Sequence, residues 1–245
     1  MAADPSWIVL ARQALPGQRI ELGPMQVASA EWTPLRALAD PRAWPRIARD
    51  YADGIGARSA VVGASCALQG LTARVLGPLI VGWALGRPVP TLVHEEVEVR
   101  LLDGRTRGAR FGRAVPAPMP ADRFATMLAS LAGPLVAAVQ AEFPLTERVL
   151  WGNIGASCAG ALGAAHRISD DTEAVGRRAE LLISGPWPVS LAVEPETCDG
   201  AWIYRRGTCC LIHLGENHRF CPGCSRVEPE DDLERWREKL GEPAR

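Results

Sequence analysis

Four of the seven cysteines in this chain lie within sixteen residues near its C-terminal end. Two adjacent cysteines are followed by ten residues and then by a C-x-x-C pair, which gives Cys209, Cys210, Cys221 and Cys224. Thiolates brought this close together either bind a soft metal or oxidise. The segment therefore predicts metal or redox chemistry, whereas the remaining three cysteines are isolated in the sequence: Cys66, Cys158 and Cys198.

Three kinds of site fit four clustered cysteines. An iron–sulfur cluster is held by four thiolates, and so is a structural zinc ion. A pair of disulfides would need an oxidising compartment. Spacing alone favours zinc, because C-x-x-C pairs are most common in zinc sites.

The adjacent pair, Cys209 and Cys210, is unusual for zinc. Successive side chains of an extended strand point to opposite faces, so two neighbours reach one ion only if the backbone is distorted. A binuclear cluster distributes its ligands over two irons and relaxes this demand. The pair therefore shifts the interpretation toward a binuclear centre.

The pattern C-C-x10-C-x2-C close to the C-terminus resembles the FhuF-like siderophore-iron reductases. Two further stretches resemble this family, Arg205-Arg206-Gly207 before the cysteines and Trp151-Gly152-Asn153 upstream. The resemblance covers most of the chain and is strongest from Trp151 onward. One departure is Ser225, which follows the last cysteine where proline is expected, and it affects a turn rather than a ligand.

The resemblance implies a [2Fe-2S] cluster held by all four of the clustered cysteines, with no catalytic residue beyond the cluster. The activity it implies is transfer of one electron to the Fe(III) of a ferric siderophore, which releases Fe(II). The sequence contains no nicotinamide or flavin motif, so we expect the electron to come from a ferredoxin, a flavodoxin or their reductase. A siderophore is therefore the expected substrate and a redox protein the expected partner.

Several polar residues flank the cysteines. Arginines there could steer an anionic ferric complex or an acidic electron carrier, or could simply balance negative charge at the centre; they are Arg205, Arg206 and Arg219. Two histidines, His213 and His218, lie inside the ten-residue gap. Ligation by two histidines, as in Rieske centres, would leave two cysteines unused, so we rank it below ligation by four thiolates.

Two other functions remain open. The first is a zinc-stabilised binding or assembly module without redox activity. The second is a ligase-like domain, because the family shares its main domain with siderophore-synthesising enzymes, although no ATP-binding motif is evident.

Composition places few further limits on function. The chain of 245 residues is 47% hydrophobic and 22% charged, which is ordinary globular composition. A net charge of −1 gives no indication of nucleic acid or an anionic membrane as a partner. The first residues lack the basic start and apolar core of a signal peptide, and Leu71 to Leu85 is too short to span a bilayer. We therefore expect a cytoplasmic protein without a stable membrane span.

The pattern of the chain predicts an α+β fold with a mostly helical body. We expect domain 1–185 to be this body, with a small hairpin, and 186–245 to be the cluster-binding segment. The expected helices cover approximately 33–39, 40–52, 57–77, 78–85, 122–142 with a break at Gly133-Pro134, 145–168, 171–183 and 228–240. The expected strands cover approximately 20–27, 91–99, 105–111, 189–193 and 201–205.

Overall fold

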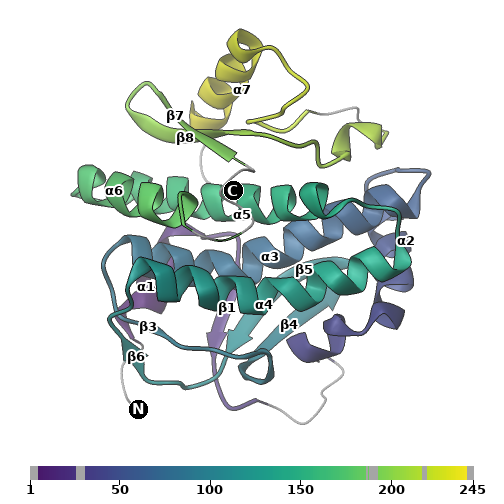
Figure 1. The fold of residues 1–245 in the computed structure, drawn as a ribbon, viewed down its shortest axis with the longest axis horizontal. Coiled ribbons are helices and arrows are strands. Elements are labelled where there is room, and N and C mark those ends of the chain that lie inside the picture. The colour runs from purple at the N-terminus through teal and green to yellow at the C-terminus, as the bar shows by residue number, and fades with distance from the viewer. Residues whose placement is uncertain (1–4, 26–30, 186, 188–192, 217–219, 242–245) are drawn as a thin grey trace.

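The computed structural model describes residues 5–25, 31–185, 187, 193–216 and 220–241. Within this part of the chain, seven α-helices and three small sheets form an α+β fold with a mostly helical body, as predicted. Figure 1 shows α3, α4 and α5 running side by side through the body, with strands β1, β4 and β5 beneath them. The helices are α1 (Ser6–Ala14), α2 (Trp44–Gly54), α3 (Ala60–Ala84), α4 (Ala121–Glu142), α5 (Glu147–Arg167), α6 (Thr172–Ile183) and α7 (Pro229–Gly241).

Helix α3 is the centre of the hydrophobic core. Its N-terminus is capped by Ser59, whose hydroxyl accepts a hydrogen bond from the Val61 N–H at 3.2 Å. Apolar side chains surround the helix on nearly all sides, which is the composition of a helix buried within a protein. Helices α1, α2 and α5 pack directly against it.

The predicted division of this helix at Gly77-Pro78 is wrong, because α3 continues through Pro78. Helix α4 likewise continues through Pro134, where we expected a break. A proline inside a helix costs about 3 kcal/mol, but burial of the large side chains on either side of it offsets this cost. The predicted helix at 33–39 is confirmed in part, because Leu35–Ala39 forms a 3-10 helix whereas Thr33–Pro34 is strand β2.

Two of these helices are long and apolar enough to cross a membrane by length and composition alone. They are α3, whose apolar window is 78% buried inside the protein, and α4, whose window is 56% buried. The expectation of insufficient length concerned the apolar run Leu71 to Leu85 alone, whereas α3 begins at Ala60 and has 25 residues. Core helices of water-soluble proteins have the same composition, and the burial of α3 accounts for its apolarity.

A four-stranded sheet supports one side of the core. Its strand order is β1-β5-β4-β2, with β1 (Arg19–Leu22) parallel to β5 (Arg105–Phe111) and the other pairs antiparallel. The hairpin between β4 (Val97–Leu102) and β5 turns at Asp103 and Gly104, whose φ values of 51° and 69° are those of the tight turn that the sequence predicted.

The register of this hairpin differs from a strict two-residue hairpin. Arg100 lies opposite Gly108 rather than Arg107, because the pairing shifts between Arg100 and Leu101. The predicted strand 91–99 also begins later, since His94–Glu96 forms a 3-10 turn. The Glu96 carboxylate accepts a hydrogen bond from the Val93 N–H at 3.2 Å, which stabilises that turn instead of a strand. Two short strands, β3 (Val89–Pro90) and β6 (Pro116–Ala117), form a separate pair.

The C-terminal segment forms a layer of its own on α5. It consists of the hairpin of β7 (Val193–Cys198) and β8 (Ala201–Arg206), the cysteine loop and α7, and Figure 1 shows it above α5 and α6. The predicted strand at 201–205 is confirmed as β8, whereas most of the predicted strand 189–193 lies outside the described residues. The division at residue 185 stays a prediction, although this layering agrees with it.

Close contact at one glycine joins α5 to the cysteine loop. A Cβ atom at Gly152 would lie 1.8 Å from the Thr208 hydroxyl oxygen, next to Cys209. No side chain larger than hydrogen fits at this distance. The small residues of α5 therefore let the cysteine segment approach the helix backbone.

We expect Gly152→Ala to destabilise the protein by about 1–3 kcal/mol and to displace the cysteine loop, because the new methyl group has no space. The matched control is Gly160→Ala in the same helix, where a Cβ atom would meet nothing within 4 Å. Since alanine favours helix formation over glycine, this control should gain about 1 kcal/mol. Urea unfolding of both variants measures the difference, and equal stability of the two would contradict the packing described here.

Candidate metal centre

The cysteine loop brings the four clustered thiols into contact with one another. The Sγ atoms of Cys210 and Cys221 are 3.9 Å apart, and Cys224 hydrogen-bonds with both Cys209 and Cys221. All seven cysteines of the chain are free. Residues that are up to fifteen positions apart in the sequence therefore form one continuous group of sulfurs, which we call the thiol group.

The thiol group has the donor chemistry of a metal ligand set, and one pair of its sulfurs has the spacing of two such ligands. Two ligands of a tetrahedral metal with bonds of about 2.3 Å lie about 3.8 Å apart, close to the Cys210–Cys221 distance of 3.9 Å. Among the described residues, no three His, Cys, Asp or Glu side chains are arranged around a single point as the ligands of one ion would be. The contacts between these sulfurs are pairwise, and the donor set fits either a binuclear iron–sulfur cluster or zinc.

A turn at Leu211 directs the two adjacent cysteines toward the same group. Leu211 has a φ of 70°, in the left-handed region that costs an L-residue about 1–2 kcal/mol. Its N–H turns back and donates to the Cys209 Sγ at 3.4 Å. An adjacent pair of ligands requires a local distortion of this kind. Here the distortion lies in a stretch that is neither helix nor strand.

Backbone N–H groups surround the sulfurs. Besides Leu211, the N–H of Ile212 donates to Cys210 and the N–H of Arg226 donates to Cys224. Each of these bonds favours the thiolate over the thiol and so lowers the pKa of the cysteine that accepts it. Thiolate is the form that binds a metal, and hydrogen bonds to ligand sulfurs also tune the potential of an iron–sulfur centre.

The C-x-x-C turn is held by two further contacts. Gly223 has a φ of 77°, and a Cβ atom there would lie 2.6 Å from the Tyr204 carbonyl oxygen, so only glycine fits. The Gly223 carbonyl accepts from the Arg206 N–H at 2.8 Å. The N–H groups of Gly223 and Cys224 both donate to the Asp232 carboxylate, at 2.9 and 3.2 Å. Helix α7 thus clamps the turn with a buried carboxylate.

Arg206 lies behind the thiol group with its guanidinium fully engaged. It is 3% exposed, and it donates to the Thr208 carbonyl at 3.1 Å, to the Gln69 side chain at 2.9 Å and to the Asn153 side chain. Asn153 in turn donates to the Ser65 hydroxyl at 2.9 Å. We call these residues the Arg206 network, and it joins α3, α5 and β8.

The Arg206 network also reaches a cysteine ligand directly. The Ser65 hydroxyl donates to the Cys210 carbonyl at 2.9 Å, and the Cys66 thiol donates to the same oxygen at 3.5 Å. The two stretches that resemble the FhuF-like family therefore meet, since Asn153 of one accepts a hydrogen bond from Arg206 of the other. Both stretches contribute residues that support the thiol group rather than residues that face solvent.

Charge within the thiol group is divided between two donors and two acceptors. Hydrogen bonds from Cys221 and Cys209 lower the pKa of Cys210 and Cys224 respectively, and the positive charge of Arg206 lowers both further. The same bonds, together with burial, raise the pKa of Cys209 and Cys221.

The flanking residues singled out in the sequence occupy different positions. Arg206 is buried, so it does not contact a substrate at the surface in this structure. Arg205 is half-buried and donates to the Val227 carbonyl at 2.7 Å. His213 places its Nδ1 3.5 Å from the Cys209 Sγ and stacks on Phe220, with ring centroids 5.5 Å apart. His218 and Arg219 lie outside the described residues.

Sequence reasoning missed Asp232, Ser65 and Gln69. Asp232 lies in the acidic first turn of α7, where an acidic side chain suits the helix dipole, so the sequence suggested a solvated helix start. Ser65 and Gln69 lie in an otherwise apolar helix, and polar residues there are the signal that could have drawn attention. Their partners are far away in the sequence.

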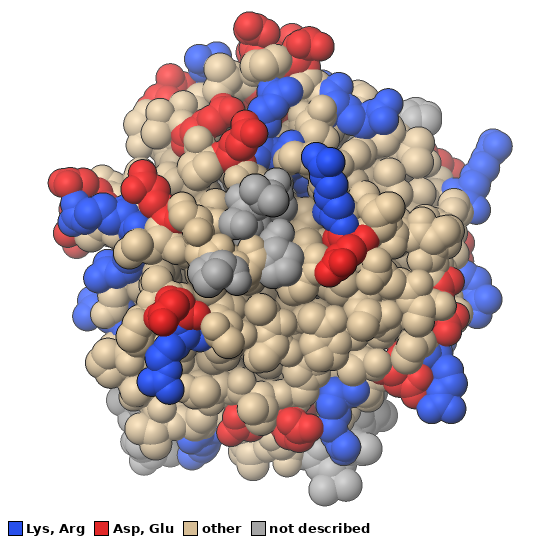
Figure 2. All heavy atoms as spheres, viewed as in Figure 1, with Lys and Arg blue, Asp and Glu red and all other residues tan. Residues whose placement is uncertain are grey.

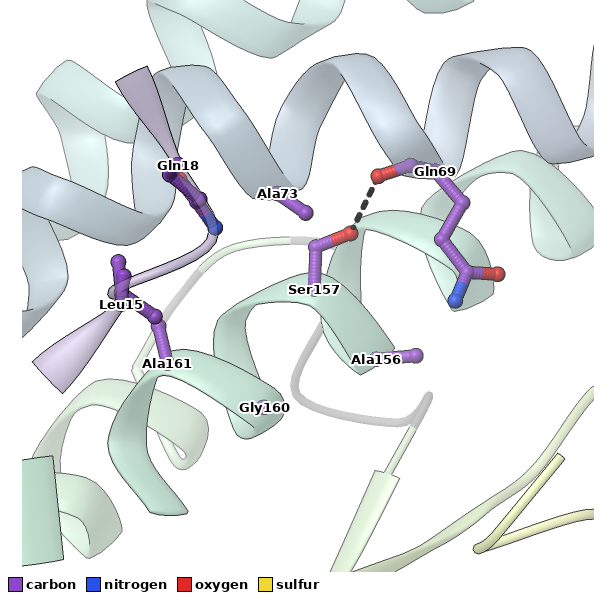
Figure 3. A pocket seen from close by; sticks show the side chains of 8 residues that line it. All are labelled: Leu15, Gln18, Gln69, Ala73, Ala156, Ser157, Gly160 and Ala161. Atoms are coloured by element: carbon purple, nitrogen blue, oxygen red, sulfur yellow. Dashed lines mark hydrogen bonds between the residues drawn. The ribbon is translucent and has the colours of Figure 1, made fainter. Parts of the chain in front are cut away.

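A recess lies between α3 and α5 beside the Arg206 network. It has a volume of about 200 Å³, and Figure 3 shows Gln69 and Ser157 at its wall, joined by a hydrogen bond of 2.9 Å. The small residues Ala73, Ala156 and Gly160 line the rest of it. The described lining carries no charged side chain, so nothing in it favours an ion.

The molecule has no single charged face in the view of Figure 2. Lysine and arginine side chains alternate with acidic ones around the edge, and other residues form much of the centre. This distribution agrees with the net charge of −1. Any attraction of a charged ligand must therefore come from a local group of charges.

No protein-family model and no curated protein matches this chain. The resemblance to the FhuF-like reductases therefore stays a prediction that depends on the residues quoted above.

We expect Asp232→Ala to release the C-x-x-C turn, because two backbone N–H groups would lose their shared acceptor. Leaving buried donors unpaired costs about 1–3 kcal/mol each. The control is Asp231→Ala, one position earlier and exposed. Metal content after purification and urea unfolding should fall for the first variant only, and equal loss in both would contradict the clamp.

We expect Arg206→Gln to destabilise the protein more than Arg205→Gln. Loss of the Arg206 guanidinium leaves several buried polar groups without a donor, whereas loss of the Arg205 guanidinium leaves one carbonyl without a donor. Removing the positive charge should also lower the reduction potential of any iron–sulfur centre bound by the thiol group, since the reduced centre carries more negative charge. A redox titration followed by electron paramagnetic resonance measures this shift. An unchanged potential in Arg206→Gln would show that the guanidinium does not act on the centre.

Proposed function

We propose that this protein binds a [2Fe-2S] cluster through Cys209, Cys210, Cys221 and Cys224 and acts as a ferric siderophore reductase. The observation that carries the proposal is the thiol group itself. It consists of four free cysteines of one loop, with the Cys210 and Cys221 sulfurs 3.9 Å apart and the Leu211 N–H directed at the Cys209 sulfur. An all-thiolate ligand set is typical of low-potential clusters, near about −400 mV in plant-type ferredoxins. Such a cluster, when bound, supplies electrons one at a time.

Reduction of a ferric siderophore requires few protein groups besides the electron carrier. A siderophore surrounds Fe(III) with hard anionic oxygens, which hold Fe(III) much more tightly than Fe(II). One electron therefore makes the complex labile, and no bond in the siderophore has to break. The Cys209 sulfur lies 3.5 Å from the His213 Nδ1, and the proposed reaction uses neither residue as a nucleophile or a base.

The residues around the thiol group have separate roles in this proposal. Cys209 and Cys221 are partly exposed while Cys210 and Cys224 are buried, so the ligand set lies at the edge of the protein, within reach of a docked complex. The buried Arg206 offsets the negative charge of four thiolates. Asp232 and Gly223 fix the geometry of the C-x-x-C turn. The electron donor in this proposal is a ferredoxin, a flavodoxin or their reductase, and the location is the cytoplasm.

A zinc-stabilised binding module is the second candidate. The 3.9 Å separation of Cys210 and Cys221 suits two thiolates of a zinc ion as well as it suits two thiolates of an iron. In that case the C-terminal layer would be structural only. The two functions differ in the metal and in redox activity, so they are separable by experiment.

Anaerobic purification followed by absorption spectroscopy tests the proposal. We expect a red-brown protein that bleaches with dithionite, contains two irons and two sulfides per chain, and reduces a ferric chelate when a ferrous trap is present. A colourless protein that contains one zinc ion would end the reductase interpretation.

Two cysteine variants test the ligand assignment. We expect Cys221→Ser to lose the cluster and ferric reduction together. Cys66→Ser should keep both, because Cys66 only donates a weak hydrogen bond to the Cys210 carbonyl and a serine hydroxyl can replace it. If Cys66→Ser also lost the cluster, the assignment of ligands would be wrong.

A further inference from the structure

Arg105 lies over the ring of Tyr51, and two further arginines, Arg107 and Arg74, lie on the same strand and on the neighbouring helix α3. Arg105 and Arg107 are alternate residues of β5 and so point to the same face of the sheet. Arg74 lies on α3. Burial lowers its pKa, Tyr51 raises it and the positive charge of Arg107 lowers it further. We call Arg74, Arg105, Arg107 and Tyr51 the arginine site.

The packing around Tyr51 fixes the arginine site. The Arg105 guanidinium lies 5.8 Å from the Tyr51 ring centroid and donates to the Gly54 carbonyl at the end of α2. The Tyr51 hydroxyl lies against Gly70, 3.8 Å from where a Cβ atom would be. Gly70 is one helical turn before Arg74, so these two residues share a face of α3. The site is thus built from α2, α3 and β5.

These arginines lack acidic partners. Within the described part of the chain, none of the three forms an ion pair, and the Nε of Arg74 is buried without a hydrogen-bond acceptor. Other arginines of the same hairpin differ, since Arg110 pairs with Glu21 and Glu98 at 3.0 and 3.3 Å. Arginines that are brought together without carboxylates repel one another, and an anion relieves that repulsion.

One acidic side chain of α2, Asp50, is paired with another arginine. Asp50 precedes Tyr51, and its carboxylate lies 3.6 Å from the Arg46 guanidinium on the same helix. Arg107 is exposed, whereas Arg74 and Arg105 are half-buried. The positive charge is therefore accessible from solvent and recessed on one side, which suits a compact anion better than a broad protein surface.

The arginine site adjoins the thiol group through Tyr51. The Tyr51 ring packs with Leu211 and Ile212 of the cysteine loop around the buried Cys66. Burial and then the nearby Cys66 raise the pKa of Tyr51, while Arg105 and Arg74 lower it, so the tyrosine interacts with both sites. An anion bound to the arginines would lie on the other side of one aromatic ring from the cysteine loop.

We infer that the arginine site binds the substrate, and that the substrate is a ferric chelate with net negative charge, such as a catecholate or carboxylate complex, rather than a neutral hydroxamate complex. The inference rests on the proposed function for the identity of the iron ligand. The guanidinium groups donate to the anionic oxygens at the edge of the chelate. In the structure Arg206 is buried and Arg205 donates to the Val227 carbonyl, whereas Arg219 lies outside the described residues.

Binding of redox-inert gallium(III) chelates tests the inference without depending on electron transfer. We expect titration calorimetry to show that the gallium tris-catecholate complex binds the wild-type protein and that Arg107→Gln and Arg74→Gln each weaken it by about tenfold or more at low salt. Arg107→Lys should keep part of the affinity because it keeps the charge. Arg107 is exposed, so its variants should fold normally.

The matched control is Arg123→Gln, an exposed arginine at the start of α4, which should bind like the wild type. Steady-state reduction of the ferric catecholate complex should show a raised KM with little change in kcat for Arg107→Gln, and no change with a neutral ferric trihydroxamate. Unchanged gallium-chelate affinity in both arginine variants would overturn the inference, even if the protein proves to be a reductase. A defect confined to reaction with an acidic donor protein would also overturn it and assign the site to that donor.

Discussion

The buried guanidinium of Arg206 is the interaction on which the cysteine segment depends. A charge that is 3% exposed is tolerated only if its donors find acceptors, and here these come from α3, α5 and the cysteine loop itself. Ser65 extends the same network to the Cys210 carbonyl. The C-terminal layer is thus held on the helical body by these polar contacts together with apolar packing, since Trp202, Ile203 and Tyr204 of β8 belong to the main hydrophobic core.

This arrangement connects stability with chemistry. The positive charge that the network buries is the charge that four thiolates need nearby, so the group that orients the segment also favours deprotonated cysteines. The close approach of Thr208 to Gly152 brings the cysteine loop near enough to α5 for this to happen. Under the proposed function, a substitution in the network would therefore affect both folding and metal binding.

Two groups of arginines lie near the thiol group, and they differ in burial and in hydrogen bonding. Arg206 is buried and saturated with hydrogen bonds, whereas Arg74, Arg105 and Arg107 are accessible and have no carboxylate partner among the described residues. The first suits a permanent structural charge, and the second suits an exchangeable anionic ligand. Tyr51 separates the two regions and packs against the cysteine loop.

The sequence alone determined the composition of the ligand set and the class of the fold. The density of Cys209, Cys210, Cys221 and Cys224 is local, and the apolar periodicity that marks the helices and the Asp103-Gly104 turn is local as well. Tertiary structure decided what local signals could not. Burial kept α3 and α4 intact through Pro78 and Pro134, although proline alone predicts a break. It also decided that Arg206 is internal, that Asp232 clamps the C-x-x-C turn, and that Arg74 meets the β5 arginines, because each of these depends on partners distant in the sequence whose approach only the packed core determines.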